Sequence, residues 1–253
     1  VKDSSISKEW GRIYVKTGQT DRAIDVLRKV FGVVSISPAV RVKSNLEEIC
    51  KKSIDMLRGK SFKTFAVRAS RTGEHNFTSQ DVATTAGDAI RTALNVQVDL
   101  DNPDVELFIE VRGNNAYLYT DKIRGPSGLP VGTQGKVLAI VRKDRDILAM
   151  WFLLKRGCKV IAVTVNMEEK IERMVERWYV KDHVKIIPIK NIDVDMIEEI
   201  LSSERCLAVV AGDGIKDLAR TLYIDKEINF PVMRPLLVFD DTEIRERMGE
   251  IMG

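Results

Sequence analysis

A short charged turn follows one of the most apolar stretches of the chain. Val137 to Val141 predicts a buried strand, and the five residues after it are all charged, Arg142-Lys143-Asp144-Arg145-Asp146. In α/β proteins, ligands bind at the carboxyl ends of such strands. The three cations predict a side-chain anion site at a helix N-terminus. The alternative is an exposed turn in which Asp146 caps the helix, and the residue types leave both interpretations open.

A second cationic window contains no acidic residue. Its charged residues are Arg58, Lys60, Lys63, Arg68 and Arg71. Side chains alternate along a strand, so Arg68 should lie opposite Phe65, with the cation exposed and the ring in the core. This pattern is typical of a surface that contacts RNA phosphates. A solvated strand edge protected by charge is the alternative.

Residues suited to metal binding or nucleophilic catalysis are sparse. His75 and His183 lie more than a hundred residues apart, and neither has a cysteine or histidine at ligand spacing. The cysteines are Cys50, Cys158 and Cys206, an odd number that suits a reducing compartment rather than a disulfide framework. Buried cysteines are usually apolar fillers, so we predict no metal site and no catalytic residue from these side chains.

Composition bounds the class of protein. The 253 residues are 44% hydrophobic and 30% charged, which predicts a soluble globular chain of about two domains. No apolar stretch approaches the ~18 residues that a membrane span requires. The net charge is +3, but basic residues are concentrated in the first two-thirds and the last third is acidic. A basic face fits a polyanionic partner or a solvated surface.

The elements before residue 125 mix strands and helices and predict an α+β arrangement. Asn45 and Ser79 are expected to cap two of the helices, and Gly113-Asn114-Asn115 should turn a hairpin. The expected elements are a strand over 10–16, a helix over 21–30, a helix over 45–58, a strand over 62–69, a helix over 79–94, and hairpin strands over 105–112 and 116–123.

The pattern changes after a segment that reads GPSGLPVGTQG, over 125–135. It has four glycines, two prolines and no charge, which predicts a linker. Beyond it, wholly apolar strands alternate with helices, which predicts a parallel sheet covered on both faces, an α/β doubly wound domain. The strands are expected over 137–141, 160–165, 184–189 and 207–211, and the helices over 146–156, 168–179 and 195–201.

Several ordered fragments resemble the tRNA 4-thiouridine synthetases (ThiI, tRNA sulfurtransferase). The resemblance runs from about Trp10 to the C-terminus. Its fragments are VFGVVSISPA over 30–39, FAVRASRTGEHNFTS over 65–79, VDLDNPD over 98–104, Glu110 to Arg112, the linker, KRGC over 155–158, and Arg234-Pro235-Leu236.

The resemblance implies a domain order. It implies an α+β N-terminal part, made of a ferredoxin-like remnant over 1–37 and a THUMP RNA-binding domain over 38–125. A linker over 126–135 and a PP-loop ATP pyrophosphatase-like α/β domain over 136–253 follow. It also implies a cytoplasmic protein that binds tRNA, with no membrane attachment. The family's sulfur-carrying cysteine is expected beyond Gly253.

The family's mechanism adenylates a uridine in tRNA, and a persulfide then delivers sulfur. The family's loop, Ser-Gly-Gly-x-Asp-Ser, falls on Arg142 to Ile147, and only Asp146 matches. The family's Thr-Gly-Glu segment falls on Ala211-Gly212-Asp213. Loss of one group that stabilises developing charge typically costs on the order of 100-fold in rate, and here the whole loop differs.

We therefore expect a tRNA-binding protein that lacks the adenylation loop, with no catalytic residue and no cofactor assigned. Asp146, Gly212 and Asp213 are the expected nucleotide-binding remnant. The expected RNA-binding residues are Lys60, Lys63, Arg68, Arg71, Arg112, Arg142, Lys143 and Arg145. One alternative is an active sulfurtransferase, which requires ATP, Mg²⁺ and a sulfur donor protein. The other is a scaffold that forms a homodimer.

Overall fold

A computed structural model describes residues 4–253, so the first three residues of the expected N-terminal domain lie outside it. The chain forms two compact units, residues 36–123 and residues 1–35 with 124–253. It passes between them in two short paired strands, β3 (Ser35–Ile36) and β9 (Ile123–Arg124). Within the described residues, no helix is long and apolar enough to span a bilayer.

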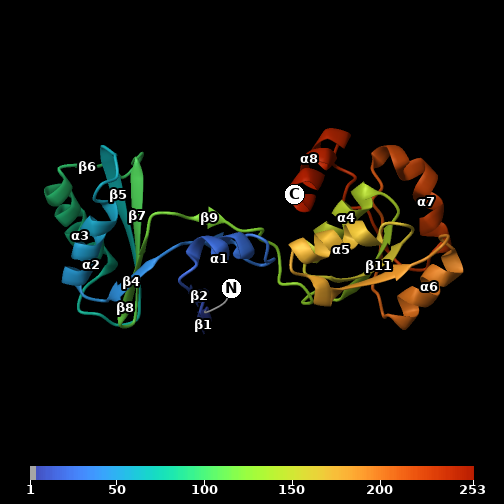
Figure 1. The fold of residues 1–253 in the computed structure, drawn as a ribbon, viewed down its shortest axis with the longest axis horizontal. Coiled ribbons are helices and arrows are strands. Elements are labelled where there is room, and N and C mark those ends of the chain that lie inside the picture. Colours follow the sequence, from blue (N-terminus) through green and yellow to red (C-terminus); the bar gives the residue numbers. More distant parts are fainter. Residues whose placement is uncertain (1–3) are drawn as a thin grey trace. The chain divides into compact units, whose positions relative to one another are not determined.

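The unit over 36–123 is a mixed five-stranded sheet in the order β4-β8-β7-β5-β6, with both of its helices packed on one face (Figure 1). Strands β5 and β7 are parallel, and β7 and β8 form the predicted antiparallel hairpin. Its elements are β4 (Val40–Lys43), α2 (Leu46–Leu57), β5 (Thr64–Thr72), α3 (Ser79–Leu94), β6 (Gln97–Val98), β7 (Val105–Arg112) and β8 (Asn115–Tyr119).

Side-chain caps explain where the two helices begin. Asn45 accepts a hydrogen bond from the Glu48 N–H at 2.8 Å, which confirms the predicted N-cap of α2. The predicted N-cap of α3 is wrong by one residue. Thr78 is the cap and forms a reciprocal capping box with Asp81, so Ser79 is the first helical residue.

A hairpin and a helix open the other unit. They are β1 (Ser5–Glu9), β2 (Arg12–Lys16) and α1 (Thr20–Leu27). The predicted strand from Trp10 begins later, because Trp10 and Gly11 form the hairpin turn and Gly11 has a φ of 73°. Sequence patterning missed β1, whose side chains are exposed throughout and so give no hydrophobic alternation.

The rest of this unit is a parallel five-stranded sheet in the order β12-β11-β10-β13-β14, which confirms the doubly wound α/β prediction. Its strands are β10 (Lys136–Val141), β11 (Lys159–Thr164), β12 (Val184–Pro188), β13 (Val209–Val210) and β14 (Val232–Met233). Its helices are α4 (Asp144–Lys155), α5 (Glu168–Arg177), α6 (Val194–Ser203), α7 (Leu218–Glu227) and α8 (Asp241–Met252), with short 3₁₀ turns over Lys181–His183 and Ile215–Asp217.

Both faces of the parallel sheet are covered, as its all-apolar strands require. Val137 and Ala139 of β10 pack into a core shared with α4, α5 and α8. Leu138 and Ile140, on the opposite face, pack with Ile197 of α6. The sheet therefore presents only its edges and the ends of its strands to solvent, and the ends are where a ligand site can form.

The glycine- and proline-rich segment over 125–135 is packed against its own unit. Leu129 N–H donates to the Lys155 carbonyl at 2.9 Å, and Gly132 N–H donates to the Gly157 carbonyl at 2.8 Å. A Cβ at Gly128 would collide with the Lys155 carbonyl oxygen. Glycine is needed there for close backbone approach, so its presence does not indicate flexibility.

Candidate functional site

The doubly wound sheet has one topological switch point, between β10 and β13. From β10 the chain winds outward to β11 and β12, and later in the opposite direction to β13 and β14. Two loops therefore leave neighbouring strand ends in different directions and border a crevice. They are the charged turn that begins at Arg142 and the segment Ala211 to Gly214.

Asp146 is the most buried charged residue of the turn, with 2% of its surface exposed. One carboxylate oxygen, Oδ2, accepts the backbone N–H of Arg142 at 2.9 Å and of Lys143 at 3.1 Å. The other, Oδ1, has no hydrogen-bond partner among the described residues. Burial raises the pKa of this carboxyl above its ordinary value. Asp146 thus caps the helix from its third position, while Lys143 occupies the N-cap itself.

The two glycines of the opposite loop lie directly against this turn. A Cβ at Gly212 would collide with Oδ1 of Asp146, and a Cβ at Gly214 would lie 2.6 Å from Nη2 of Arg145. Neither glycine has a positive φ, so close packing is the reason that glycine is required. The two loops therefore interlock: side chains of the loop after β10 pack against the backbone of the loop after β13.

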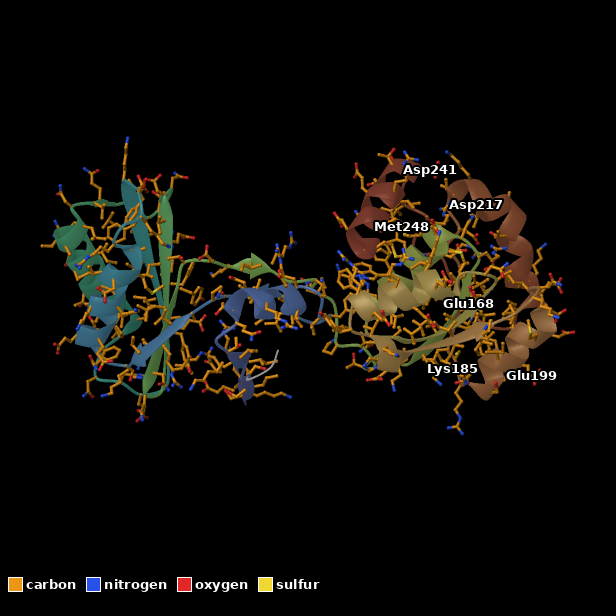
Figure 2. The ribbon with its side chains drawn as sticks, viewed as in Figure 1. Glu168, Lys185, Glu199, Asp217, Asp241 and Met248 are labelled. Atoms are coloured by element: carbon orange, nitrogen blue, oxygen red, sulfur yellow. The ribbon has the colours of Figure 1, made fainter. Side chains whose placement is uncertain are left out.

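Ion pairs neutralise the charges around this interlock. Arg145 pairs with Asp217 at 3.1 Å, where α7 begins; Figure 2 labels Asp217. The Arg234 side chain is 7% exposed and pairs with Asp213 at 3.4 Å and with Asp225 at 2.6 Å. Bonding to Asp225 raises the pKa of Arg234 and lowers that of Asp225. Sequence analysis named Arg234 only as part of a family fragment and missed this role, because both of its partners are distant in sequence.

A shallow depression of about 510 Å³ lies beside the switch point, at the ends of β10, β11 and β12. Arg142 and Lys190 contribute cations to its wall, and Asn166 and Met167 contribute neutral surface. Arg142 and Lys143 are exposed and have no ion-pair partner among the described residues. Of the three cations of the predicted anion site, only Arg145 is paired within the part of the chain that the structure describes.

The predicted RNA-binding residues of the other unit are exposed or partly exposed, but several are already bonded. Arg68 pairs with Glu106 at 2.8 Å and donates to the Leu100 carbonyl at 2.7 Å. Arg112 pairs with Glu110 at 3.5 Å. Lys60 donates to Thr120 and Arg71 to the Gly73 carbonyl, while the Lys63 side chain is exposed. Phe65 is fully buried, as predicted.

Sequence analysis missed a second depression, of about 440 Å³, on the helix-free face of this sheet. Phe108 and Tyr119 stack there with ring centroids 5.2 Å apart, and the Lys122 ammonium lies 3.5 Å from the Phe108 centroid. Glu106 and Glu110 also line it. The sequence signal that could have found it is the alternation along β7, in which Glu106, Phe108 and Glu110 share the face opposite the aliphatic residues of the core.

No described residue provides a reactive thiol or a metal centre. Burial raises the pKa of each of the three cysteines, that of Cys206 to about 11. A thiol needs a lowered pKa and exposure to carry sulfur. Among residues 4–253, no group of three or more His, Cys, Asp or Glu side chains could hold a metal ion. His75 hydrogen-bonds the Gly113 carbonyl at 2.7 Å.

The fold defines a chain that joins a mixed α+β sheet to a doubly wound α/β domain. Family models identify the parts: a THUMP domain over residues 43–121 and a ThiI ferredoxin-like domain over residues 1–37. A probable tRNA sulfurtransferase of Methanothermobacter thermautotrophicus is 32% identical, and the alignment covers 96% of this chain and 74% of the relative. The chain belongs to the tRNA sulfurtransferase family, which confirms the resemblance drawn from its sequence.

Solved structures agree with this assignment. The crystal structure of PH1313 from Pyrococcus horikoshii superposes with a TM-score of 0.82 at 30% identity, covering 98% of this chain and 86% of that one. The crystal structure of a 4-thiouridine synthetase in complex with RNA and bound ATP also superposes with a TM-score of 0.82. Its sequence identity is 25%, and the match covers 98% of this chain and 76% of that one. The predicted fold class, with its THUMP and PP-loop-like parts, is confirmed.

Proposed function

We propose that this chain binds tRNA through its THUMP-containing part and does not bind ATP in the manner of an adenylating PP-loop. The observation that carries the proposal is the turn from Arg142 to Ile147, which has no glycine and no serine. The proposal assigns residues 38–125 to RNA binding and residues 136–253 to an α/β domain without adenylation chemistry. It places the protein in the cytoplasm, together with its tRNA partner.

The residues at the switch point do not fit a phosphate loop. Such a loop binds phosphate through backbone N–H groups that glycines leave accessible. Here the N–H groups of Arg142 and Lys143 already donate to Asp146. The Arg145 guanidinium lies against Gly214 and pairs with Asp217. Asp144 adds a negative charge at the first helical position, where a phosphate would otherwise be attracted.

The family supports tRNA as the partner. The relatives carry the name tRNA sulfurtransferase, and the 4-thiouridine synthetase was solved as a complex with RNA. The exposed cations Lys63, Arg71 and Lys143 have no ion-pair partner among the described residues, so they are available for phosphates. Arg68 and Arg112 can contribute only after exchanging a carboxylate partner for a phosphate.

An active sulfurtransferase is the second candidate, and two observations favour it. Asp146 is retained at the position of the family's loop aspartate, and a relative with the same fold was solved with ATP bound. In that case ATP and Mg²⁺ would be bound by altered contacts from Arg142 and Lys143, and a partner protein would supply sulfur. Cys158 and Cys206 are buried and Cys50 is partly exposed, and burial raises the pKa of all three, which does not favour a sulfur-carrying thiolate.

A filter-binding titration with tRNA tests the RNA part of the proposal. We expect affinity to fall steeply with salt, because each phosphate contact releases counterions. A folded acceptor stem should outcompete an unstructured oligonucleotide of equal charge, because duplex RNA is recognised by shape and backbone. Equal binding of the two would reduce the interaction to nonspecific charge. Absence of salt-dependent binding would contradict the proposal and favour a dimerising scaffold.

A further inference from the structure

Lys155, at the C-terminal end of α4 and so at the other end of this helix from the charged turn, lies within electrostatic range of three other cations. Lys155 and Arg156 end that helix, Arg124 comes from β9, and Arg247 comes from α8. Burial lowers the pKa of Lys155, and repulsion from the other three cations lowers it further, with Glu250 as the opposing charge. We call these four residues the α4 cluster. None of them forms an ion pair within residues 4–253.

Aromatic rings hold two members of the α4 cluster in place. The Lys155 ammonium lies 5.2 Å from the Trp151 ring, and the Arg247 guanidinium lies 4.5 Å from the Phe239 ring. The Phe152 ring stacks on Phe239 with centroids 5.5 Å apart, and it meets Trp151 edge-on with centroids also 5.5 Å apart. Cation–π contacts fix each cation without neutralising its charge. The cluster is therefore positioned and remains strongly positive.

Packing of α8 against the core fixes the position of Arg247. The neighbouring residue, Met248, labelled in Figure 2, packs against the core shared with α4 and α5. Nε of Arg247 is buried and has no hydrogen-bond partner among the described residues. A buried N–H donor without a partner is costly. A ligand oxygen that reached this face would relieve that cost.

The helix end itself does not require these cations. Lys and Arg often accompany a helix C-terminus because they neutralise its last carbonyls. Here Gly157 N–H donates to Leu154 at 2.9 Å and Cys158 N–H to Leu153 at 3.0 Å, the pattern of a Schellman cap. Leu129 N–H bonds the Lys155 carbonyl as well. Backbone donors already satisfy the carbonyls, so helix capping does not account for the cluster.

We propose that the α4 cluster is a phosphate-binding surface that contacts the backbone of bound RNA. This inference rests on the proposed tRNA binding and adds a second contact region, within the α/β unit and separate from the window over 58–71. Arginine dominates the cluster, and its planar guanidinium forms bidentate hydrogen bonds with phosphate oxygens. A phosphate would neutralise cations that form no ion pair with a described carboxylate.

The test compares two double variants of the full chain, each of which removes two exposed cations. R124Q/R156Q removes charge from the α4 cluster, and R173Q/K181Q removes equal charge from α5 and the 3₁₀ turn after it. We expect R124Q/R156Q to flatten the salt slope of tRNA binding by about 1.4–1.8, because each phosphate that a cation neutralises adds ~0.7–0.9 to the slope. R173Q/K181Q and the charge-conserving R124K/R156K should retain the parent slope.

Lysine acetylation gives a second readout that does not depend on a variant folding. Lys155 should be acetylated readily in the free protein, because its lowered pKa leaves more of the amine neutral. Saturating tRNA should suppress this acetylation, whereas Lys226, exposed on α7, should be acetylated equally with and without tRNA.

The outcomes separate this inference from the function on which it rests. If the parent binds tRNA and R124Q/R156Q keeps its affinity and slope, the α4 cluster is not an RNA contact, although the proposed function stands. If the parent shows no salt-dependent tRNA binding, both fail. If polyglutamate of equal charge binds the parent but not R124Q/R156Q, while tRNA binds both proteins equally, the cluster recognises acidic protein and the inference is overturned.

Discussion

The α/β domain holds two groups of charged residues with opposite states of compensation. At the switch point, Arg145 and Arg234 each face a carboxylate, and the Arg234 side chain is almost fully buried. In the α4 cluster, three arginines act on Lys155 by charge repulsion, and none of the four cations has an ion-pair partner among the described residues. The first group stabilises a loop arrangement from within. The second group is left for a ligand to neutralise.

This difference bears on where the chain binds its partner. The switch point is where a doubly wound sheet normally binds ligand, but here its loops bond to each other. Buried carboxylates and arginines that satisfy one another offer little to a phosphate. Cations that lack ion-pair partners and are held over aromatic rings do offer a phosphate a binding site. We infer that the anion-binding capacity of the domain lies in the α4 cluster and in the exposed Arg142 and Lys143, and not in the interlocked loops themselves.

Removing a buried compensated charge should give the largest effect. We expect R234M to lower the free energy of unfolding by about 3–5 kcal/mol, because Asp213 and Asp225 lose their shared partner. Urea unfolding measures this. The control is K216M, whose exposed pair with Asp241 should contribute less than about 1 kcal/mol. Equal, small effects would show that the switch point is not held together by Arg234.

A smaller effect is expected from the cationic window of the other unit. The sequence predicts that R68A/R71A weakens tRNA binding. The structure refines this: R71A should flatten the salt slope by ~0.7–0.9, whereas R68A alone should change it little, because Glu106 already neutralises Arg68. E106Q should release Arg68 and steepen the slope. Filter binding over a salt series checks all three variants, and a marked flattening with R68A alone would contradict the argument from compensation.

The pH dependence of stability should reveal the buried carboxyl of the switch point. Because burial raises the pKa of Asp146 above 3.8, the fold favours its protonated form. Its contribution to stability is therefore greatest at low pH and declines as pH rises from about 3.8 through the raised pKa. Melting temperatures between pH 4 and 7 should show this decline in the parent and not in D146N. D144N, which alters an exposed carboxylate, should keep it.

Much of the fold could be predicted because local pattern and packing agree. The strand β10 was predicted from its apolar run, which reflects burial on both faces of the sheet. The end of α4 was predicted from Gly157, whose φ of 90° favours glycine. The strand predicted over 207–211 is shorter in the structure, where β13 is Val209–Val210, although Leu207 and Ala211 N–H still donate to carbonyls of Lys136 and Met233 in the neighbouring strands. The late helices α7 and α8 were not predicted at all.

The sites were harder to predict than the fold. The positions of Asp146 and Gly212 followed from their place in the family's order, but their direct contact required the sheet order. The α4 cluster brings together residues 124, 155, 156 and 247, which no window along the sequence can contain. Conversely, the window over 58–71 contained Arg68, whose neutralising partner is Glu106 on a neighbouring strand. Charge counted along a sequence does not show which charges are paired in space.

Calorimetry with ATP and Mg²⁺ tests the central claim most directly, because the proposal and its main rival differ in whether ATP is bound at the switch point. Parent protein that has been shown to bind tRNA is titrated with ATP, beside D146N checked for folding by circular dichroism. The account predicts no saturable heat at micromolar ATP for either protein. A micromolar dissociation constant in the parent that disappears in D146N would contradict it and favour the sulfurtransferase alternative.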